Sequence, residues 1–497
     1  MNRNKMIQQL ESQPEWDVCI IGGGATGLGI ALDAASRGYK TALFEQYDFA
    51  KGTSSRSTKL VHGGVRYLQQ GNIKLVMEAL KERGLLLKNA PHLVHNQKFI
   101  VPNYKWWEKP FYGIGLKIYD WMAGSLGLGP SQLLSIEETL ALTPTLYPED
   151  LTGGVLYHDG QFDDARLAIS IAQTAIEHKA VVLNYFPVTG LLKMQQKICG
   201  VWVKDSTTGK DYEVKSKVVI NATGVFTDAI MKMDDVKHEN IISPSQGIHL
   251  VVDKEFLPGD TAIMIPRTDD GRVLFAVPWH NKIVLGTTDT PVETIAAEPI
   301  PMQEEIDFIL KHIGRYLTKE PQMSDVRSMF AGLRPLVKGK SKITSALSRD
   351  HVITVSASDM ITISGGKWTT YRKMAEDTVN LAAVKLNSQV TSVTKELKLA
   401  GHDKPLPPPE ISQLSDDALK SLIKSAVEKE MCMTVEDFLS RRTRQLLLDA
   451  RVAIEKAPLV AQLMSEIMGK EEVWKTEQIN NFNAIAKNYM PTLNFQL

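Results

Sequence analysis

Three glycines near the N-terminus have the spacing that a bound pyrophosphate requires. Gly22-x-Gly24-x-x-Gly27 follows a short apolar run typical of a β-strand and opens a segment with helical periodicity. Glycine at these positions permits a tight turn and a close approach of phosphate to a helix N-terminus. Glu45 ends the next expected strand, where a carboxylate can bind ribose hydroxyls and disfavours a 2′-phosphate. The pattern predicts a dinucleotide site, and FAD and NAD share it.

A second polar segment, GTSSRSTKLVHGGVRYL at residues 52–68, concentrates hydroxyls, glycines and cations just before an expected helix. Such a segment can bind phosphate and approach a planar ring. The structural alternative is a run of Ser and Thr that caps a helix. For His62 within it, orientation of a cofactor and a structural hydrogen bond are equally good interpretations.

The elements around these segments are those of a doubly wound protein. Residues 17–45 predict a strand, a helix and a strand, which begin a parallel sheet. Between about 245 and 290, four β-rich runs separated by turn residues predict an antiparallel sheet. The strand at 360–366 and the helix after it return to the first sheet, and KPLPPPE at 404–410 marks a boundary before a helical tail.

Composition excludes several classes of protein. Lys+Arg and Asp+Glu both number 57, so net charge gives no sign of a nucleic-acid partner. The cysteines Cys19, Cys199 and Cys432 are far apart and predict neither disulfides nor a metal site. The polar N-terminus lacks a secretory core, and no apolar stretch approaches the roughly 20 residues of a membrane span. We expect a cytoplasmic protein.

Tryptophans and lysines alternate in one unusual stretch, from Trp106 to Trp121. Its rings could lie at headgroup depth while its lysines contact anionic lipid, or the stretch could be a buried connector between domains. Basic residues Arg441, Arg442 and Arg444 could form a second such patch, although a solvated helix face is the commoner explanation.

Seven motifs together identify a family resemblance. The segments GGGATGLGIALDAASRG, TSSRSTKLVHGGVRYL, DDARL, NATGVFTD, GTTDT, GLRPL and SGGKWTTYRKMAE occur in order across roughly residues 17–380. They resemble the aerobic, FAD-dependent glycerol-3-phosphate dehydrogenase family. The resemblance implies noncovalent FAD, oxidation of sn-glycerol 3-phosphate to dihydroxyacetone phosphate, and electron transfer to a membrane quinone. A peripheral position on the cytoplasmic face of the membrane and a homodimer are further expectations.

The implied fold is α/β, with a Rossmann-like FAD-binding domain of the D-amino-acid-oxidase/glutathione-reductase type, an antiparallel-sheet substrate domain and a short helical C-terminal tail. We expect FAD-binding parts at 1–97, 151–243 and 335–402, and a substrate or cap segment with membrane contact at 98–150. The antiparallel substrate domain is expected at 244–334, the Pro-rich linker at 403–410, and a helical domain at 411–497 that lacks the first half usual in the family.

The resemblance also assigns residues to FAD. In addition to the glycine turn and Glu45, the expected cofactor-binding residues are Ser54, Ser55, Ser57, Thr58, Lys59, His62, Gly63, Gly64, Val188, Ala222, Thr223, Gly224, Gly365, Gly366, Lys367, Thr369 and Thr370. The helix after Gly366 would stabilise negative charge on reduced flavin.

A phosphorylated substrate needs cations, preferably guanidinium groups, and its hydroxyl needs a base. Arg66, Tyr67, Arg334, Arg349 and Lys367 are the expected substrate ligands. The expected catalytic residues are His249, Lys367 and Arg334. His249 is the first choice of base and Lys367 the second. A buried structural histidine is the alternative for His249, as a structural ion pair is for each arginine.

Three other functions remain open. A glycerol-3-phosphate oxidase would carry out the same reduction of FAD and then use oxygen. A related enzyme could oxidise another hydroxy acid or an amine on the same fold. A noncatalytic flavin-binding protein could use its tail for docking, although the intact set of candidate residues argues against it.

Overall fold

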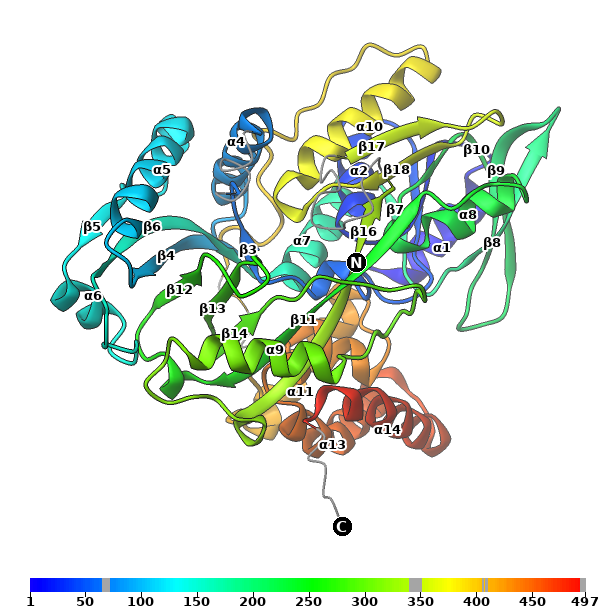
Figure 1. The fold of residues 1–497 in the computed structure, drawn as a ribbon. Coiled ribbons are helices and arrows are strands. Elements are labelled where there is room, and N and C mark those ends of the chain that lie inside the picture. The colour runs from blue at the N-terminus through cyan, green and yellow to red at the C-terminus, as the bar shows by residue number, and fades with distance from the viewer. Residues whose placement is uncertain (65–71, 339–350, 405, 407–409, 492–497) are drawn as a thin grey trace.

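The computed structural model describes residues 1–64, 72–338, 351–404, 406 and 410–491. Within these residues, two β-sheets lie side by side and a group of C-terminal helices packs below them in the view of Figure 1. The helices α4 and α5 stand at the far edge of the second sheet, away from these C-terminal helices (Figure 1).

The first sheet is the parallel sheet that the sequence predicts. Among the described residues its strands run in the order β17 (His351–Val355), β18 (Ile361–Gly365), β10 (Asp211–Asn221), β1 (Trp16–Ile21), β2 (Thr41–Phe44) and β7 (Val181–Leu183). The hairpin β8 (Val188–Met194) and β9 (Lys197–Lys204) extends from β10. All neighbours from β18 to β7 pair in parallel, so β1, β2 and β10 end at one edge.

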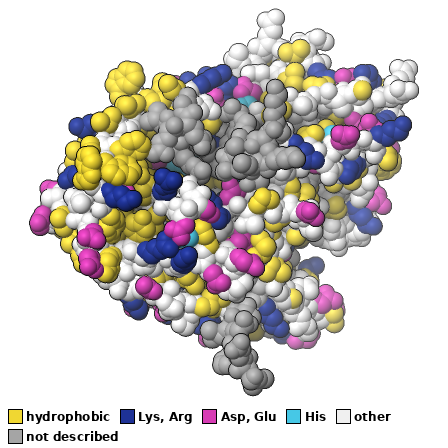
Figure 2. Space-filling model, viewed as in Figure 1, with side chains coloured by type: hydrophobic (Ala, Val, Ile, Leu, Met, Phe, Trp, Pro, Cys, Tyr) yellow, Lys and Arg dark blue, Asp and Glu magenta, His cyan; other side chains and the backbone are white. Residues whose placement is uncertain are grey.

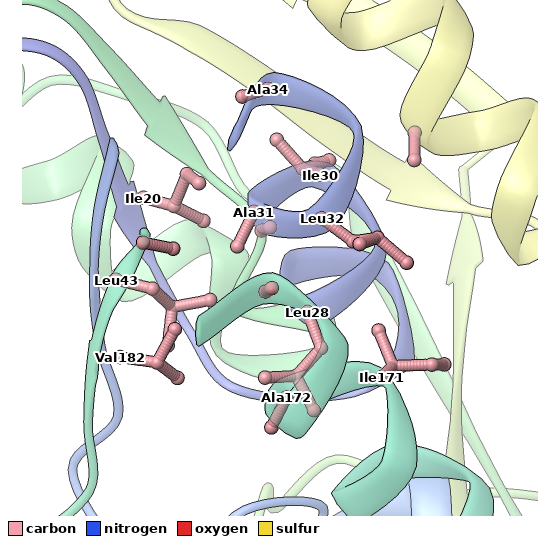
Figure 3. Packing of buried hydrophobic residues seen from close by; sticks show 14 of the residues in the cluster. Ile20, Leu28, Ile30, Ala31, Leu32, Ala34, Leu43, Ile171, Ala172 and Val182 are labelled. Carbon is pink, nitrogen blue, oxygen red and sulfur yellow. The ribbon is translucent and has the colours of Figure 1, made fainter. Parts of the chain in front are cut away.

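Three helices pack on this sheet because their residues are small or apolar: α2 (Ala25–Ser36), α7 (Asp164–Glu177) and α10 (Tyr371–Lys385). In the view of Figure 3, Leu28 of α2 lies between Ile171 of α7 and the strand residues Leu43 and Val182, and all four side chains are fully buried. Each such side chain contributes about 1.5–3 kcal/mol by its burial. A Cβ at Gly29 would lie 2.9 Å from the Tyr371 ring, so α2 and α10 can approach only with glycine there.

The second sheet is antiparallel apart from one pair of strands. Its order is β15 (Thr290–Pro291), β11 (Ile242–Asp253), β14 (Lys282–Gly286), β13 (Leu274–Trp279), β12 (Thr261–Ile265), β4 (Val94–Asn103), β6 (Gly153–Phe162) and β3 (Leu60–Val61). β16 (Val326–Val337) pairs with β11, and β5 (Gln132–Leu134) pairs with β6. Only β4 and β12 are parallel among these described strands. The predicted fold class, with its antiparallel substrate domain, is confirmed.

The second sheet reaches beyond the segment 244–334. β3 and β6 lie in the segments 1–97 and 151–243 that we expected in the FAD-binding part, and β16 continues to Val337. The physical reason is that β4 and β6 pair over their whole lengths, from Val94 opposite Phe162 to Asn103 opposite Gly153. These backbone hydrogen bonds join β6 to the substrate side, and β3 is the short strand that follows it at the sheet edge.

The remaining helices before the tail surround the two sheets. They are α1 (Arg3–Ser12), α4 (Ile73–Asn89), α5 (Glu108–Ala123), α6 (Ile136–Leu142), α8 (Thr227–Asp234) and α9 (Gln303–Gly314). α5 carries most of the predicted aromatic and lysine-rich stretch.

The tail is helical, as predicted, and has its own hydrophobic core. It contains α11 (Asp416–Glu430), a π-helical turn (Asp437–Arg442), α12 (Gln445–Leu448), α13 (Ala450–Met468) and α14 (Glu472–Ala486). Its core includes Val251 and Phe330 of the second sheet, so the tail is packed directly against the substrate domain.

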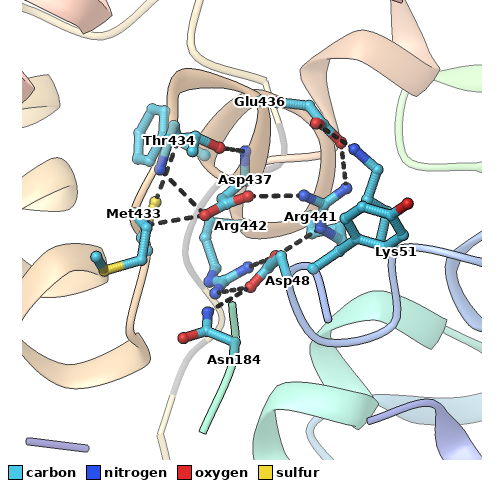
Figure 4. A network of polar contacts seen from close by, with 12 residues as sticks. Asp48, Lys51, Asn184, Met433, Thr434, Glu436, Asp437, Arg441 and Arg442 are labelled. Atoms are coloured by element: carbon cyan, nitrogen blue, oxygen red, sulfur yellow. Dashed lines mark hydrogen bonds and ion pairs between the residues drawn. The ribbon is translucent and has the colours of Figure 1, made fainter. Parts of the chain in front are cut away.

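A buried network of charges fastens the tail to the first sheet (Figure 4). Arg442 binds both carboxylate oxygens of Asp48, at 2.6 and 2.9 Å, and Arg441 binds Asp48 and Asp437. Burial alone would raise the pKa of Asp48, but Arg442 and Arg441 hold it well below its usual value. The expected solvent-exposed patch at Arg441, Arg442 and Arg444 is therefore wrong, because all three side chains are buried among acidic partners.

We predict that Asp48→Asn destabilises the protein by about 3–5 kcal/mol, because two buried guanidinium groups lose a charged partner. Thermal unfolding measures this as a lower Tm. Glu466→Gln is the matched control, because Glu466 forms an exposed pair with Lys420 and its loss should cost less than about 1 kcal/mol. Equal Tm values for the two variants would contradict the role given to Asp48.

Candidate functional site

A single cavity of about 820 Å³ is lined by residues of both sheets. The first sheet contributes the C-terminal ends of β1, β2 and β18 and the segment that follows β10. The second sheet contributes β11, β13 and β16, and α5 closes one side. The carboxyl edge of a parallel sheet is the usual ligand position in such folds, and the predicted glycine turn lies there.

The glycine turn has the geometry that pyrophosphate binding needs. Gly22 has a φ of +106°, and a Cβ there would lie 2.8 Å from the carbonyl oxygen of Ala222. Gly24 is the N-cap of α2 and lines the cavity. Gly27 faces away from the cavity, and its Cβ would overlap the carbonyl of Gly22. The first two glycines therefore offer backbone to a ligand, while the third allows the helix to pack on the turn.

Glu45 lies at the end of β2, as predicted, and its carboxylate points to the turn. It accepts hydrogen bonds from the N–H groups of Gly23, at 2.6 Å, and Tyr47, at 2.9 Å. Burial raises the pKa of Glu45, although these two hydrogen bonds oppose the shift. The carboxylate is thus fixed beside the cavity, where a ribose would lie.

The segment 52–59 is held between the two sheets by its own side chains. The Ser54 hydroxyl accepts from the N–H of Ala25 at 3.0 Å, and the Thr53 hydroxyl donates to the carbonyl of Leu333 at 2.6 Å. Ser57 donates to Asp164 at 2.7 Å. Ser54, Ser57 and Thr58 line the cavity, as predicted.

Lys59 lies elsewhere than predicted. Its ammonium is fully buried, binds Asp164 at 2.8 Å and the carbonyl of Ser55 at 2.7 Å, and lies 5.0 Å from the centre of the Trp279 ring. Neither Lys59 nor Ser55 is among the described residues that line the cavity. A buried ammonium needs a carboxylate partner, and Asp164 directs it away from the cofactor side.

The far end of the cavity is rich in glycine. Gly365 and Gly366 have φ values of +77° and +79°, and both line the cavity. His62 lines it too, and its N–H donates to the Thr369 hydroxyl at 3.2 Å. Gly63 and Thr370 are buried behind this lining rather than in it. The remaining predicted cofactor residues that line the cavity are Gly64, Val188, Ala222, Thr223, Gly224, Lys367 and Thr369.

His249 extends from β11 into this end of the cavity. Its Nε2 is 2.9 Å from the Thr58 hydroxyl, its ring stacks on Phe330 at 4.9 Å, and its Nδ1 has no hydrogen-bond partner among the described residues. Burial lowers the pKa of His249 well below its usual value, and the charges of Lys59 and Arg334 add to the shift. The imidazole is therefore neutral at physiological pH, as a general base must be.

Arg334 and Lys367 line the same cavity. Arg334 lies on β16 opposite Ser245, and its guanidinium donates to the carbonyl of Thr288 at 2.8 Å and to that of Gln246 at 3.3 Å. Lys367 follows the glycine pair at the end of β18. Three other predicted substrate ligands, Arg66, Tyr67 and Arg349, fall outside the described residues.

The cavity also contains side chains that the sequence did not single out. Arg56 is buried and ion-paired with Glu298 at 2.6 Å, and the indole N–H of Trp368 donates to the carbonyl of Ser54 at 2.9 Å. Arg272 lines the opposite wall. Arg56 and Trp368 belong to motifs already recognised, but a motif does not report the direction of each side chain.

The residues fit an FAD molecule. The dinucleotide turn and the glycine pair lie in one continuous cavity, whose volume is at the upper end of the roughly 300–1,000 Å³ of ligand pockets. Side chains at Gly22 and Gly366 would collide with the protein itself, so the backbone is open to a ligand at both ends.

Two family models match the chain. "FAD dependent oxidoreductase" matches residues 17–372, and "C-terminal domain of alpha-glycerophosphate oxidase" matches residues 395–478. The first match includes both the glycine turn and Lys367. Together they confirm the predicted cofactor, FAD, and account for the helical tail.

Relatives and solved structures agree with these models. Mitochondrial glycerol-3-phosphate dehydrogenase of Mus musculus is 40% identical, over 96% of this chain and 74% of that protein. The enzyme of Schizosaccharomyces pombe is 36% identical, over 98% of this chain and 89% of that protein. A glycerol-3-phosphate dehydrogenase from Bacillus halodurans, solved with FAD, is 30% identical with a TM-score of 0.81 and 99% coverage of both chains.

A more distant structure, the L-alpha-glycerophosphate oxidase of Mycoplasma pneumoniae, shares the fold with a TM-score of 0.61 at 20% identity, over 76% of this chain and 97% of that one. The extent and identity of the closer matches decide the family. The chain belongs to the FAD-dependent glycerol-3-phosphate dehydrogenases.

Proposed function

We propose that this enzyme oxidises sn-glycerol 3-phosphate to dihydroxyacetone phosphate and passes the electrons to a membrane quinone. The observation that carries the proposal is the meeting of His249, Arg334 and Lys367, from three different elements, in the cavity that holds the dinucleotide turn. FAD supplies the hydride acceptor when bound. The protein must bind the phosphate, orient the carbinol carbon and remove the hydroxyl proton.

Arg334 is suited to hold the phosphate because its guanidinium is fixed in place. The carbonyls of Gln246 on β11 and of Thr288, which lies between β14 and β15, hold the group, and the carboxylate of Asp289 lies 3.5 Å away. These contacts fix the orientation of the guanidinium inside the cavity, where its positive charge can attract a phosphate. Lys367 and Arg56 add positive charge to the same cavity. This arrangement favours a dianionic substrate over an uncharged polyol.

His249 is suited to remove the hydroxyl proton. When Nε2 carries the proton and donates it to Thr58, Nδ1 is left as an acceptor for the substrate. Burial, together with the charges of Lys59 and Arg334, keeps the ring unprotonated before the reaction. The hydroxyl proton then passes to the ring while the carbinol carbon gives up its hydride to the bound cofactor. Lys367 remains the second candidate for the base.

The acceptor is inferred from α5. Large apolar side chains are exposed on α5 and on the two residues before it: Trp106, Trp107, Phe111, Ile114, Ile118 and Trp121. Figure 2 shows hydrophobic side chains gathered on this side of the molecule. Phe111, Ile114 and Ile118 also line the cavity. No described helix is long and apolar enough to pass through a bilayer. The arrangement supports peripheral attachment to a membrane, with a lipid-soluble quinone as acceptor. The cytoplasmic face of that membrane stays a prediction.

The alternative is the same oxidation with oxygen as the acceptor. An assay that offers quinone and oxygen separately, and measures peroxide when oxygen is used, decides between the two. A homodimer stays a prediction, to be measured as the mass in solution.

We predict that sn-glycerol 3-phosphate bleaches the flavin absorbance of the purified holoenzyme in the absence of oxygen, because only this compound offers both the dianion and the correctly placed carbinol. Glycerol should bleach it at least tenfold more slowly, since it lacks the phosphate and each lost charged hydrogen bond costs about 1.5–3 kcal/mol. The enantiomer sn-glycerol 1-phosphate should also be slower, because with its phosphate bound it cannot present the carbinol hydrogen in the same direction. An oxidised spectrum with all three compounds would exclude this substrate and favour a hydroxy acid, an amine or a noncatalytic role.

We predict that His249→Gln slows flavin reduction by about 10²–10⁴-fold while FAD stays bound. In the natural enzyme the pKa of His249 is depressed, so the base stays neutral below the usual value near 6.5. The rate kcat/KM should therefore stay level through pH 6.5 and decline only as the pH falls through the lowered pKa. Lys367 would be the better candidate for the base if kcat/KM declined with a midpoint at or above pH 6.5. The same would hold if the His249→Gln variant reduced its flavin at the unmutated rate.

We predict that Trp106→Ser with Trp121→Ser weakens binding to vesicles of phosphatidylglycerol and phosphatidylcholine at least tenfold, because both rings are more than 80% exposed on this patch. Co-sedimentation with the vesicles measures this binding. Trp202→Ser is the control, since Trp202 is exposed on β9, outside the patch. Equal sedimentation of both variants would exclude this patch as the site of attachment.

A further inference from the structure

A buried polar cluster that the reaction above does not use lies at the edge of the cavity. Tyr119 of α5, Asp159 of β6 and Arg83 of α4 come from three elements and are each at most 3% exposed. The Tyr119 hydroxyl donates to Asp159 at 2.9 Å, and Arg83 binds the same carboxylate at 2.7 Å. The Arg83 guanidinium also lies 5.6 Å from the centre of the Tyr119 ring. Every charge in the cluster thus has a partner.

The cluster reaches the cofactor through one backbone group. The N–H of Gly63 donates to the Tyr119 hydroxyl at 2.8 Å, with Asp159 at 3.4 Å from the same nitrogen. A side chain at Gly63 would overlap Tyr119 and Leu80, so only glycine permits this approach. Gly63 stands between His62 and Gly64, which both line the cavity.

The segment 62–64 is consequently held from two sides. Thr369, three residues after the glycine pair of the first sheet, binds the backbone of His62. Tyr119 and Asp159 bind the backbone of Gly63 from the side of the second sheet and α5. Asp159 itself lines the cavity, and it lies next to Gly160, which pairs with Val61 at the end of β3. The carboxylate is therefore both a support for the segment and a negative charge beside the cofactor.

We propose that Tyr119 and Asp159 are positioning residues, which hold the backbone at Gly63 and Gly64 against FAD and set the charge that the flavin meets there. Tyr119 acts through Gly63, and Asp159 acts through Tyr119 and by its own charge. Because Tyr119 belongs to α5, the helix with the exposed apolar face is also the helix that orients the cofactor segment. The proposal rests on FAD as the cofactor, and its test needs no substrate, so it can fail independently of the substrate assignment.

The test compares three holoenzymes with the natural one. Tyr119→Phe removes the hydroxyl and keeps the ring, so the Gly63 N–H and Asp159 lose their shared partner. We expect the FAD dissociation constant, followed by flavin fluorescence after dilution, to rise about tenfold. Tyr104→Phe is the matched control, because its hydroxyl donates to the carbonyl of Tyr147 at 2.8 Å, outside the described cavity lining. Its FAD dissociation constant should stay within twofold.

Asp159→Asn provides the second measurement. Loss of a negative charge beside the cavity should raise the flavin midpoint potential, because reduction adds negative charge to the cofactor. The potential is measured by dye equilibration on protein that retains FAD. The proposal is overturned if Tyr119→Phe and Asp159→Asn both keep the FAD affinity and the midpoint potential of the unmutated protein. A lower Tm in Tyr119→Phe with unchanged FAD affinity would also overturn it, because it would show a purely structural role.

Discussion

The buried carboxylate of Asp164 connects the cofactor domain to the reacting end of the cavity. It stands at the start of α7, on the first sheet, and binds both Ser57 and Lys59. Thr58, between these two residues, is thereby directed to His249 on the second sheet. Burial raises the pKa of Asp164 and Lys59 opposes the shift. Burial also lowers the pKa of His249, and the same ammonium adds to that shift. One ion pair thus sets the position of the segment and contributes to keeping the base neutral.

The same physical rule explains how the tail is attached. A buried charge is tolerated only with a partner, and breaking such a pair costs more than forming it gains. Asp48 directly follows Tyr47, whose N–H donates to Glu45, and it receives two guanidinium groups from the π-helical turn. Lys51 then pairs with Glu436, and Arg56 in the cavity pairs with Glu298. The tail therefore contributes to the cofactor loop through charge pairing, even though the described cavity lining contains none of its residues.

Local signals in the sequence predicted the glycine turn, Glu45 and His249, because each depends on a short spacing or on the alternation of a strand. Pairing between strands that are far apart in the sequence could not be predicted from such local signals. The sequence of β6, GGVLYHDGQF, has no pattern that assigns it to one sheet, and only its register with β4 places it in the second. The direction of individual side chains could not be predicted either. Lys59 lies in the predicted cofactor motif but turns toward Asp164. The basic residues at 441–444 are buried because carboxylates on other segments pair with them.

The two faces of α5 bear on the choice of acceptor. An oxidase needs only a path for a small gas molecule, and an apolar outer surface beside the cavity would be a cost in water. A quinone arrives from lipid, so its path should begin at an apolar surface and end at the flavin. Phe111, Ile114 and Ile118 belong to both the exposed face and the cavity lining, whereas Tyr119 on the inner face contacts Gly63. This continuity from surface to cofactor favours a lipid-soluble acceptor over oxygen.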